Sequence, residues 1–77
     1  MEQSTTYINI EKREMDKILS QLGEIIDTSE LTFSKAYNWK GCGYFQTYVD
    51  FTMNDGKTLT VSLRNNYDII PKSLRVS

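Results

Sequence analysis

The sequence predicts an α+β fold in which one amphipathic helix packs on one face of an antiparallel sheet of three to four strands, forming two layers. Three observations lead to this prediction. Apolar residues recur with helical spacing once, in residues 10–26. Three later segments, residues 31–39, 44–53 and 57–64, alternate apolar and polar side chains as strands do. A chain of 77 residues has room for a single domain, residues 1–77.

The helix is predicted from a stripe of apolar residues at i, i+3, i+4 and i+7 spacing: Met15, Ile18, Leu19, Leu22, Ile25 and Ile26. Asn9 is a suitable N-cap, and Glu11 and Glu14 would lie in the first turns, where the helix dipole favours negative charge. Because the stripe continues beyond Gly23, we expect this glycine on the solvent side of the helix rather than at its end.

The three strands differ in regularity. The first alternates imperfectly and would place Leu31, Phe33, Tyr37 and Trp39 on one face. The second and third have clear apolar faces, made of Phe45, Val49, Phe51 and Met53 in one and Leu59, Val61 and Leu63 in the other.

The turn at residues 54–56 fixes how the last two strands pair. A two-residue loop would place Phe51 opposite the polar Thr60, so that a core residue would pair with a solvent-facing one. A three-residue loop, with Gly56 in the left-handed region, places Phe51 opposite Leu59. The sequence therefore predicts the three-residue loop.

Two further segments extend this plan. Residues 5–8 are a candidate edge strand. After Arg64, two asparagines end the strand, Ile69 and Ile70 are expected to be buried, and Pro71 is expected to open a single helical turn through Leu74.

Composition argues against several function classes. Ten acidic and nine basic residues give a net charge of −1, which lacks the basic footprint of a nucleic-acid or membrane-surface binder. A single cysteine allows no intramolecular disulfide and suits a reducing compartment. The N-terminal residues have no apolar signal segment, and no stretch is apolar enough to cross a membrane. We expect a soluble, cytoplasmic protein.

The sequence has few residues of the types that catalyse reactions or bind metal ions. The chain has no histidine, which removes the commonest general base and metal ligand. Cys42 lies in the segment WKGCGYF, where it lacks the neighbours that would activate a thiol, so we interpret the glycines as shaping a hairpin. An intermolecular disulfide or redox role for Cys42 is the alternative, as is an acid-base site of Glu30, Asp50 and Asp55. We predict no catalytic residue, metal or cofactor, and therefore no enzyme.

Aromatic residues suggest a binding surface instead. In the strand at 44–53, Tyr44, Gln46 and Tyr48 would project from the face opposite the core. Trp39 would lie at the same end of the sheet. The predicted protein interface consists of Trp39, Tyr44, Gln46, Tyr48 and Asp50. Alternatively, the strand has a different register, the tyrosines cover glycine or the N-terminal segment, or they stack on single-stranded nucleic acid. Five acids along the helix form a candidate acidic flank: Glu11, Glu14, Asp16, Glu24 and Asp27.

The C-terminal segment IIPKSLRV, residues 69–76, resembles the endings of some small phage and mobile-element proteins, including at least one anti-CRISPR inhibitor. This resemblance implies a single-domain inhibitor that binds a host protein or ribonucleoprotein complex in the host cytoplasm by protein contact. A homodimer through the same aromatic face is a further partner that the sequence allows. A small nucleic-acid-binding regulatory module is the alternative function.

Overall fold

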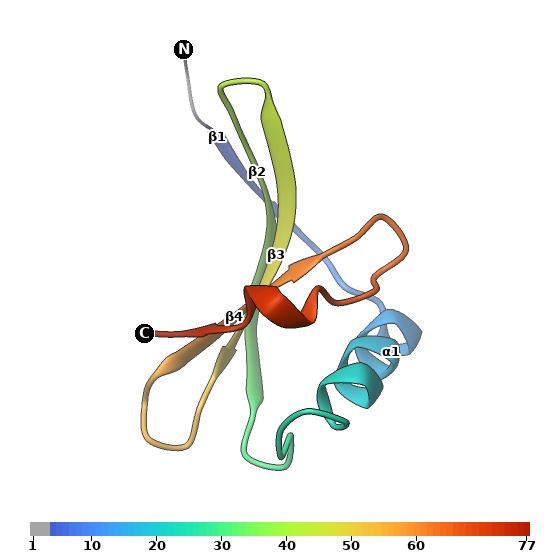
Figure 1. The fold of residues 1–77 in the computed structure, drawn as a ribbon, viewed down its shortest axis with the longest axis vertical. Helices are drawn as coiled ribbons and strands as arrows, with labels where there is room; N and C mark the ends of the chain where they lie inside the picture. Colours follow the sequence, from blue (N-terminus) through green and yellow to red (C-terminus); the bar gives the residue numbers. More distant parts are fainter. Residues whose placement is uncertain (1–3) are drawn as a thin grey trace.

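The computed structural model describes residues 4–77, which form an antiparallel sheet of five strands and one α-helix (Figure 1). The strand order follows the chain order, from β1 at one edge to β5 at the other. The elements are β1 (Ser4–Ile8), α1 (Lys12–Leu22), β2 (Thr32–Gly41), β3 (Tyr44–Thr52), β4 (Thr58–Leu63), a 3₁₀ helix (Pro71–Ser73) and β5 (Arg75–Val76). The α+β class predicted from the sequence is confirmed.

The sheet has five strands where three to four were predicted. The candidate edge strand is present as β1, which pairs with β2 from Ser4 opposite Lys40 to Ile8 opposite Ala36. The unexpected strand is β5, in which Val76 pairs with Leu59. The predicted helical turn after Ile70 is present as the 3₁₀ helix, and it brings the chain back alongside β4. A two-residue strand is too short for an alternating pattern to reveal it.

The hydrophobic core is a cluster of buried residues from α1 and from one face of the sheet, which we call the core face. The helix contributes Ile18 and Leu22, and the remaining buried apolar residues come from β2, β3, β4 and the segment after β4: Ala36, Val49, Phe51, Leu59, Val61, Leu63 and Ile69. The opposite face of the sheet, the outer face, carries the other residues of each strand because successive side chains alternate. Within residues 4–77, no helix combines the length and apolar character that crossing a membrane requires.

The helix is shorter than the predicted range of 10–26. It begins after Glu11, not after Asn9, and the Glu11 N–H donates to the Glu14 carboxylate at 3.0 Å. It ends before Gly23, where the following N–H groups bond to carbonyls three residues back, as in Ile25 N–H to Leu22 O at 2.9 Å. These tighter bonds turn the chain away from the helix axis and leave Ile25 48% exposed.

The predicted turn between β3 and β4 is confirmed. Phe51 pairs with Leu59, as the three-residue loop requires. The Met53 N–H donates to Lys57 O at 2.8 Å, the Gly56 N–H donates to Met53 O at 3.0 Å, and Gly56 has a φ of +86°. The need to place both apolar faces on one side of the sheet was therefore enough to fix this register.

The prediction that Phe33, Tyr37 and Trp39 share one face is wrong, because β2 contains a β-bulge. The register shifts between Phe33, which pairs with Phe51, and Lys35, which pairs with Asp50. The extra residue puts Phe33 on the core face but Tyr37 and Trp39 on the outer face, because one inserted residue reverses the alternation.

The turn between β2 and β3 consists of Cys42 and Gly43, since Gly41 pairs with Tyr44. Both turn residues have positive φ, 48° for Cys42 and 76° for Gly43, as in a type I′ hairpin turn. The hairpin predicted for WKGCGYF is therefore present, but the left-handed positions fall on Cys42 and Gly43 rather than on the two glycines.

Replacing Cys42 by asparagine is expected to raise the free energy of unfolding by about 0.5–1 kcal/mol, because asparagine tolerates the left-handed region better than most residues. For a domain of this size such a gain raises the melting temperature by a few degrees, which thermal unfolding followed by circular dichroism would detect. Cys42→Ser is the control, since serine keeps the shape without this backbone preference, and it should leave the melting temperature unchanged. An equal effect of both substitutions would contradict the backbone explanation.

Candidate binding face

Five aromatic residues gather on the outer face of β1, β2 and β3, and we call this group the aromatic band: Tyr7, Tyr37, Trp39, Tyr44 and Tyr48. Tyr7, Tyr37 and Tyr48 form a row across the three strands, because Tyr37 pairs with Tyr7 on one side and with Tyr48 on the other. Their ring centroids lie 6.1 Å and 5.5 Å apart along this row. Cross-strand aromatic pairs at such distances stabilise a sheet and fix the orientation of the rings.

The other two rings of the band lie at the tip of the β2–β3 hairpin. The centroids of Trp39 and Tyr44 are 5.5 Å apart in an edge-to-face arrangement. Figure 1 shows this hairpin extending away from α1, so its tip has no helix over its core face. Phe45 is consequently 60% exposed although it points to the same side as Val49 and Phe51.

Exposure varies along the aromatic band. Tyr7 is 66% exposed and Tyr44 is 51% exposed, whereas Tyr37, Trp39 and Tyr48 are half-buried. The band therefore offers ring edges and faces to solvent from side chains that are already held in place. Little side-chain freedom would be lost when such rings contact a partner.

Gln46 lies opposite Trp39 on the outer face and is fixed by two hydrogen bonds. Its Nε2 donates to Leu63 O at 3.2 Å, and its Oε1 accepts a bond from the Tyr44 hydroxyl at 3.4 Å. The amide thus links the tip of β3 to the end of β4 and holds Tyr44 in position.

Asp50 belongs to the outer face but is only 5% exposed. Its Oδ1 accepts hydrogen bonds from the Thr60 hydroxyl at 2.8 Å and from the Tyr37 hydroxyl at 3.5 Å. A buried carboxylate must be hydrogen-bonded to be tolerated, and these two hydroxyls supply its partners. Of the five predicted interface residues, Asp50 is the one placed beneath the surface, where it holds Tyr37 rather than meeting solvent.

Two tyrosines of the band, Tyr37 and Tyr48, have a pKa raised above the ordinary value, so their hydroxyls remain protonated at neutral pH. Burial raises the pKa of Tyr37, and the nearby Asp50 carboxylate raises it further because a second negative charge would be repelled. Burial also raises the pKa of Tyr48, with a further contribution from Tyr44. Both hydroxyls are therefore hydrogen-bond donors across the physiological range.

Two cations share the outer face with the band. In the strand register, Lys35 on β2 lies opposite Asp50 on β3, and Arg75 on β5 lies opposite Thr60 on β4. Arg75 also lines a shallow hollow of about 420 Å³, together with Tyr37, Trp39, Gly41, Cys42, Tyr44 and Tyr48. The Cys42 thiol is free and exposed at the end of this hollow.

The five residues of the acidic flank lie on or next to α1, on the side of the sheet opposite the band. Glu14 accepts the Glu11 N–H, and Asp16 forms an ion pair with Lys12 at 3.1 Å. Asp27 accepts bonds from the backbone N–H and the hydroxyl of Ser29 at 3.0 and 2.7 Å, which lower the pKa of Asp27. Glu24 is exposed just after the helix.

The acids named as an alternative acid-base site do not meet. Asp50 lies on the outer face, whereas Glu30 and Asp55 line a pocket that includes Leu59 and therefore opens on the core side. Among residues 4–77, no three side chains of His, Cys, Asp and Glu are grouped to hold a metal ion.

Sequence reasoning named Trp39, Tyr44, Gln46, Tyr48 and Asp50, and the structure brings them together on one face. It missed Tyr7 and Tyr37, whose positions depend on the pairing of β1 and on the β2 bulge. What the arrangement offers chemically is a set of fixed rings, two hydroxyl donors and two flanking cations. Comparison of the chain with protein-family models, curated proteins and solved structures found no match.

Proposed function

We propose that this chain is a small, non-enzymatic binding protein that acts in the cytoplasm by covering a surface of a larger protein or ribonucleoprotein complex. The observation that carries the proposal is the aromatic band on the outer face. Helix and sheet would act as two layers, in which α1 covers the core face and the outer face meets the partner. Tyrosine and tryptophan are enriched at the energetic centres of protein interfaces, because they bury a large area with few rotatable bonds.

The resemblance to small anti-CRISPR proteins supports an inhibitor that works by stoichiometric binding. In that case the partner is a host defence complex, and the acidic flank along α1 would compete for a basic nucleic-acid channel. The residues of the resemblance form structural elements here. Ile69 is buried in the core, Pro71 begins the 3₁₀ helix, and Arg75 and Val76 form β5.

The proposal is tested by affinity capture from the cells in which the protein is naturally made, using matched bait variants. Trp39→Ala and Tyr48→Ala are each expected to reduce capture of the specific partner at least tenfold, since truncating a central aromatic residue typically costs about 2 kcal/mol or more of binding free energy. Binding of the purified partner, measured by calorimetry, gives the same comparison in quantitative form.

Phe45→Ala is the control for this experiment. It removes an exposed ring from the same hairpin, but on the face opposite the band, so partner capture should be unchanged. If the Trp39 and Tyr48 variants keep full binding while remaining folded, the aromatic band is not the interface.

A nucleic-acid-binding module is the second candidate, favoured by the presence of Lys35 and Arg75 on the same face as stackable rings. It requires gel retardation of single-stranded RNA or DNA that weakens steeply with salt and is lost in a Lys35→Ala, Arg75→Ala variant. Under the first proposal, purified protein gives no such salt-sensitive retardation.

A further inference from the structure

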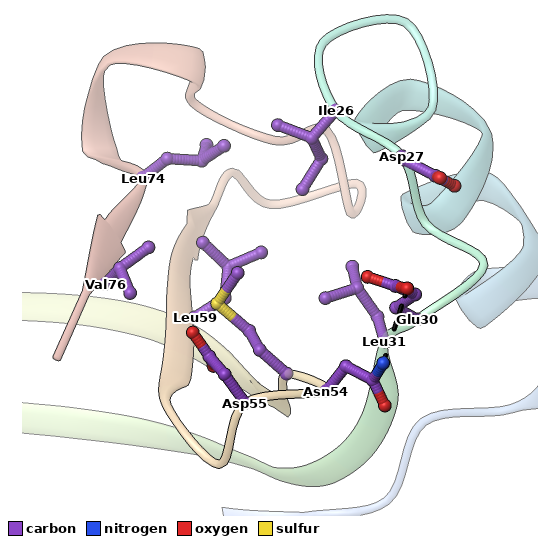
Figure 2. A pocket seen from close by; sticks show the side chains of 10 residues that line it. Ile26, Asp27, Glu30, Leu31, Asn54, Asp55, Leu59, Leu74 and Val76 are labelled. Carbon is purple, nitrogen blue, oxygen red and sulfur yellow. Dashed lines mark hydrogen bonds between the residues drawn. The ribbon is translucent and has the colours of Figure 1, made fainter.

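A pocket of about 650 Å³ opens on the core side of the sheet, between the segment after α1, the β3–β4 turn and the C-terminal strand. Its lining is mainly apolar and comes from Ile26, Leu31, Met53, Leu59, Leu74 and Val76. Figure 2 shows Ile26 and Leu74 pointing toward one another across the opening, with Leu31 and Leu59 below them. The volume falls in the range of pockets that bind ligands, roughly 300–1,000 Å³.

Carboxylates stand around this apolar lining. Glu30 and Asp55 lie on opposite sides of it in Figure 2, and Asp27 lies farther out. None of the residues that line the pocket is basic, and none of the three acids forms an ion pair within residues 4–77. The occupant that complements such a pocket has an apolar group to fill it and positive charges to meet its rim.

The two nearer acids are held in place by local bonds that do not neutralise them. Glu30 Oε1 accepts a bond from Asn54 Nδ2 at 3.3 Å, which joins the segment after α1 to the β3–β4 turn. Asp55 Oδ1 accepts the Lys57 N–H at 3.1 Å within that turn. The rim charges are therefore fixed before any ligand arrives, and less ordering is needed on binding.

The open edge of β5 borders the same pocket. Thr58 and Ser77 exchange two backbone hydrogen bonds, at 2.8 and 3.0 Å, so the next residue along, Val76, belongs to a pair that exchanges none. The Val76 N–H and C=O consequently point away from β4, toward an edge on which no strand of residues 4–77 pairs. The Val76 side chain lines the pocket, so backbone donor, backbone acceptor and pocket lie together.

We infer that this pocket binds an extended segment of another protein, which pairs with the edge of β5, inserts one apolar side chain and carries lysine or arginine two residues before and after it. In a strand added beside β5, the residue opposite Val76 directs its side chain into the pocket. Residues two positions away point to the same face and reach the acidic rim. This site lies on the core side of the sheet and is independent of the aromatic band.

The test uses blocked synthetic peptides and ¹⁵N-labelled full-length protein, with binding followed by amide chemical shifts. The probe is KTLTK, in which leucine and both lysines share one face of a strand. Three controls each change one feature: ETLTE reverses the charge, KTATK removes the apolar anchor, and TKLKT keeps the composition but moves both lysines to the other face. KTLTK is expected to bind at least about tenfold more tightly than each control, and its binding should weaken at high salt.

Variants of the protein test the rim directly. The double variant Glu30→Gln, Asp55→Asn keeps side-chain shape and hydrogen-bonding groups, and it is expected to lower the affinity for KTLTK about tenfold, a few-fold per charge pair. The matched control is Asp16→Asn, Glu24→Gln, which removes the same charge from exposed positions in and beside α1, outside the pocket. It should change the affinity less than twofold.

Several results would overturn the inference. The inference is wrong if KTLTK and ETLTE bind equally, or if KTLTK does not bind at millimolar concentration. It is also wrong if the peptide shifts amide signals outside the region of Leu59, Leu74 and Val76. Dimerisation that depends on concentration, buries the pocket and excludes the peptide would also overturn the inference, because the occupant is then a second copy of this chain.

The peptide comparison is made on the unmodified protein, so it does not depend on how the variants fold. Because the aromatic band is not involved, Tyr48→Ala should leave peptide binding intact even if it abolishes capture of the partner.

Discussion

Replacing Phe51 by alanine is expected to destabilise the domain by about 3–5 kcal/mol, the usual cost of truncating a buried aromatic residue. Phe51 is 1% exposed and lies in the central strand, between Phe33 on β2 and Leu59 on β4. Its ring is 6.3 Å from that of Phe33. A domain of this length is stable by roughly 4–12 kcal/mol in total, so the loss is a large share of its free energy of unfolding. Urea denaturation followed by circular dichroism measures it.

Phe45→Ala is the matched control, because Phe45 has the same side chain, lies in the same strand and points to the same side. It is 60% exposed, and its removal should change stability by no more than about 0.5 kcal/mol. If Phe51→Ala gives no folded population, Phe51→Leu provides a smaller, measurable loss of about 1–2 kcal/mol. Equal losses at Phe45 and Phe51 would contradict the placement of the core.

Replacing Ile18 by alanine is expected to cost about 2–5 kcal/mol, because this side chain is fully buried and joins α1 to the sheet. Alanine has the higher helix propensity, which offsets only a few tenths of a kcal/mol of this cost. The experiment is again equilibrium denaturation, and the loss of helix docking should appear as a single cooperative transition at lower urea concentration.

Ile25→Ala provides the comparison for Ile18, and it also separates the predicted helix from the observed one. If the helix continued to residue 26, Ile25 would extend the buried stripe and its loss would be nearly as costly. In the structure, Ile25 follows the helix and is 48% exposed, so the expected loss is below about 1 kcal/mol. A cost as large as that of Ile18→Ala would favour the longer helix.

The parts of the fold that could be predicted are those in which several independent constraints agree. The β3–β4 turn is the clearest case, since alternation on both strands and the single glycine of the turn, Gly56, permit only one register with Phe51 opposite Leu59. The helix was recognised for a similar reason, because its apolar stripe repeats over several turns. The predicted C-terminal end of the helix is wrong. Ile25 and Ile26 keep the helical spacing of apolar residues, but the backbone already turns at Gly23.

The parts that could not be predicted depend on contacts between distant residues. The β2 bulge adds one residue between Phe33 and Lys35, and no residue type marks its position. That single residue moves Tyr37 to the outer face and completes the row with Tyr7 and Tyr48. Asp50 was assigned to the correct face by alternation, but its burial follows from the hydroxyls of Thr60 and Tyr37, which only the assembled sheet brings to it.

The order of the strands also sets how easily each one forms. The β2–β3 and β3–β4 pairings close short turns, whereas pairing β1 with β2 closes a loop from Asn9 to Lys35 that contains the whole of α1. Loop-closure entropy makes that step more costly by about 1–2 kcal/mol. By loop closure, β1 is therefore the costliest of the strands β1 to β4 to add to the sheet. Since Tyr7 lies on β1, the row of Tyr7, Tyr37 and Tyr48 is complete only once this longer loop has closed, whereas the other four rings of the band need only the pairing of β2 with β3.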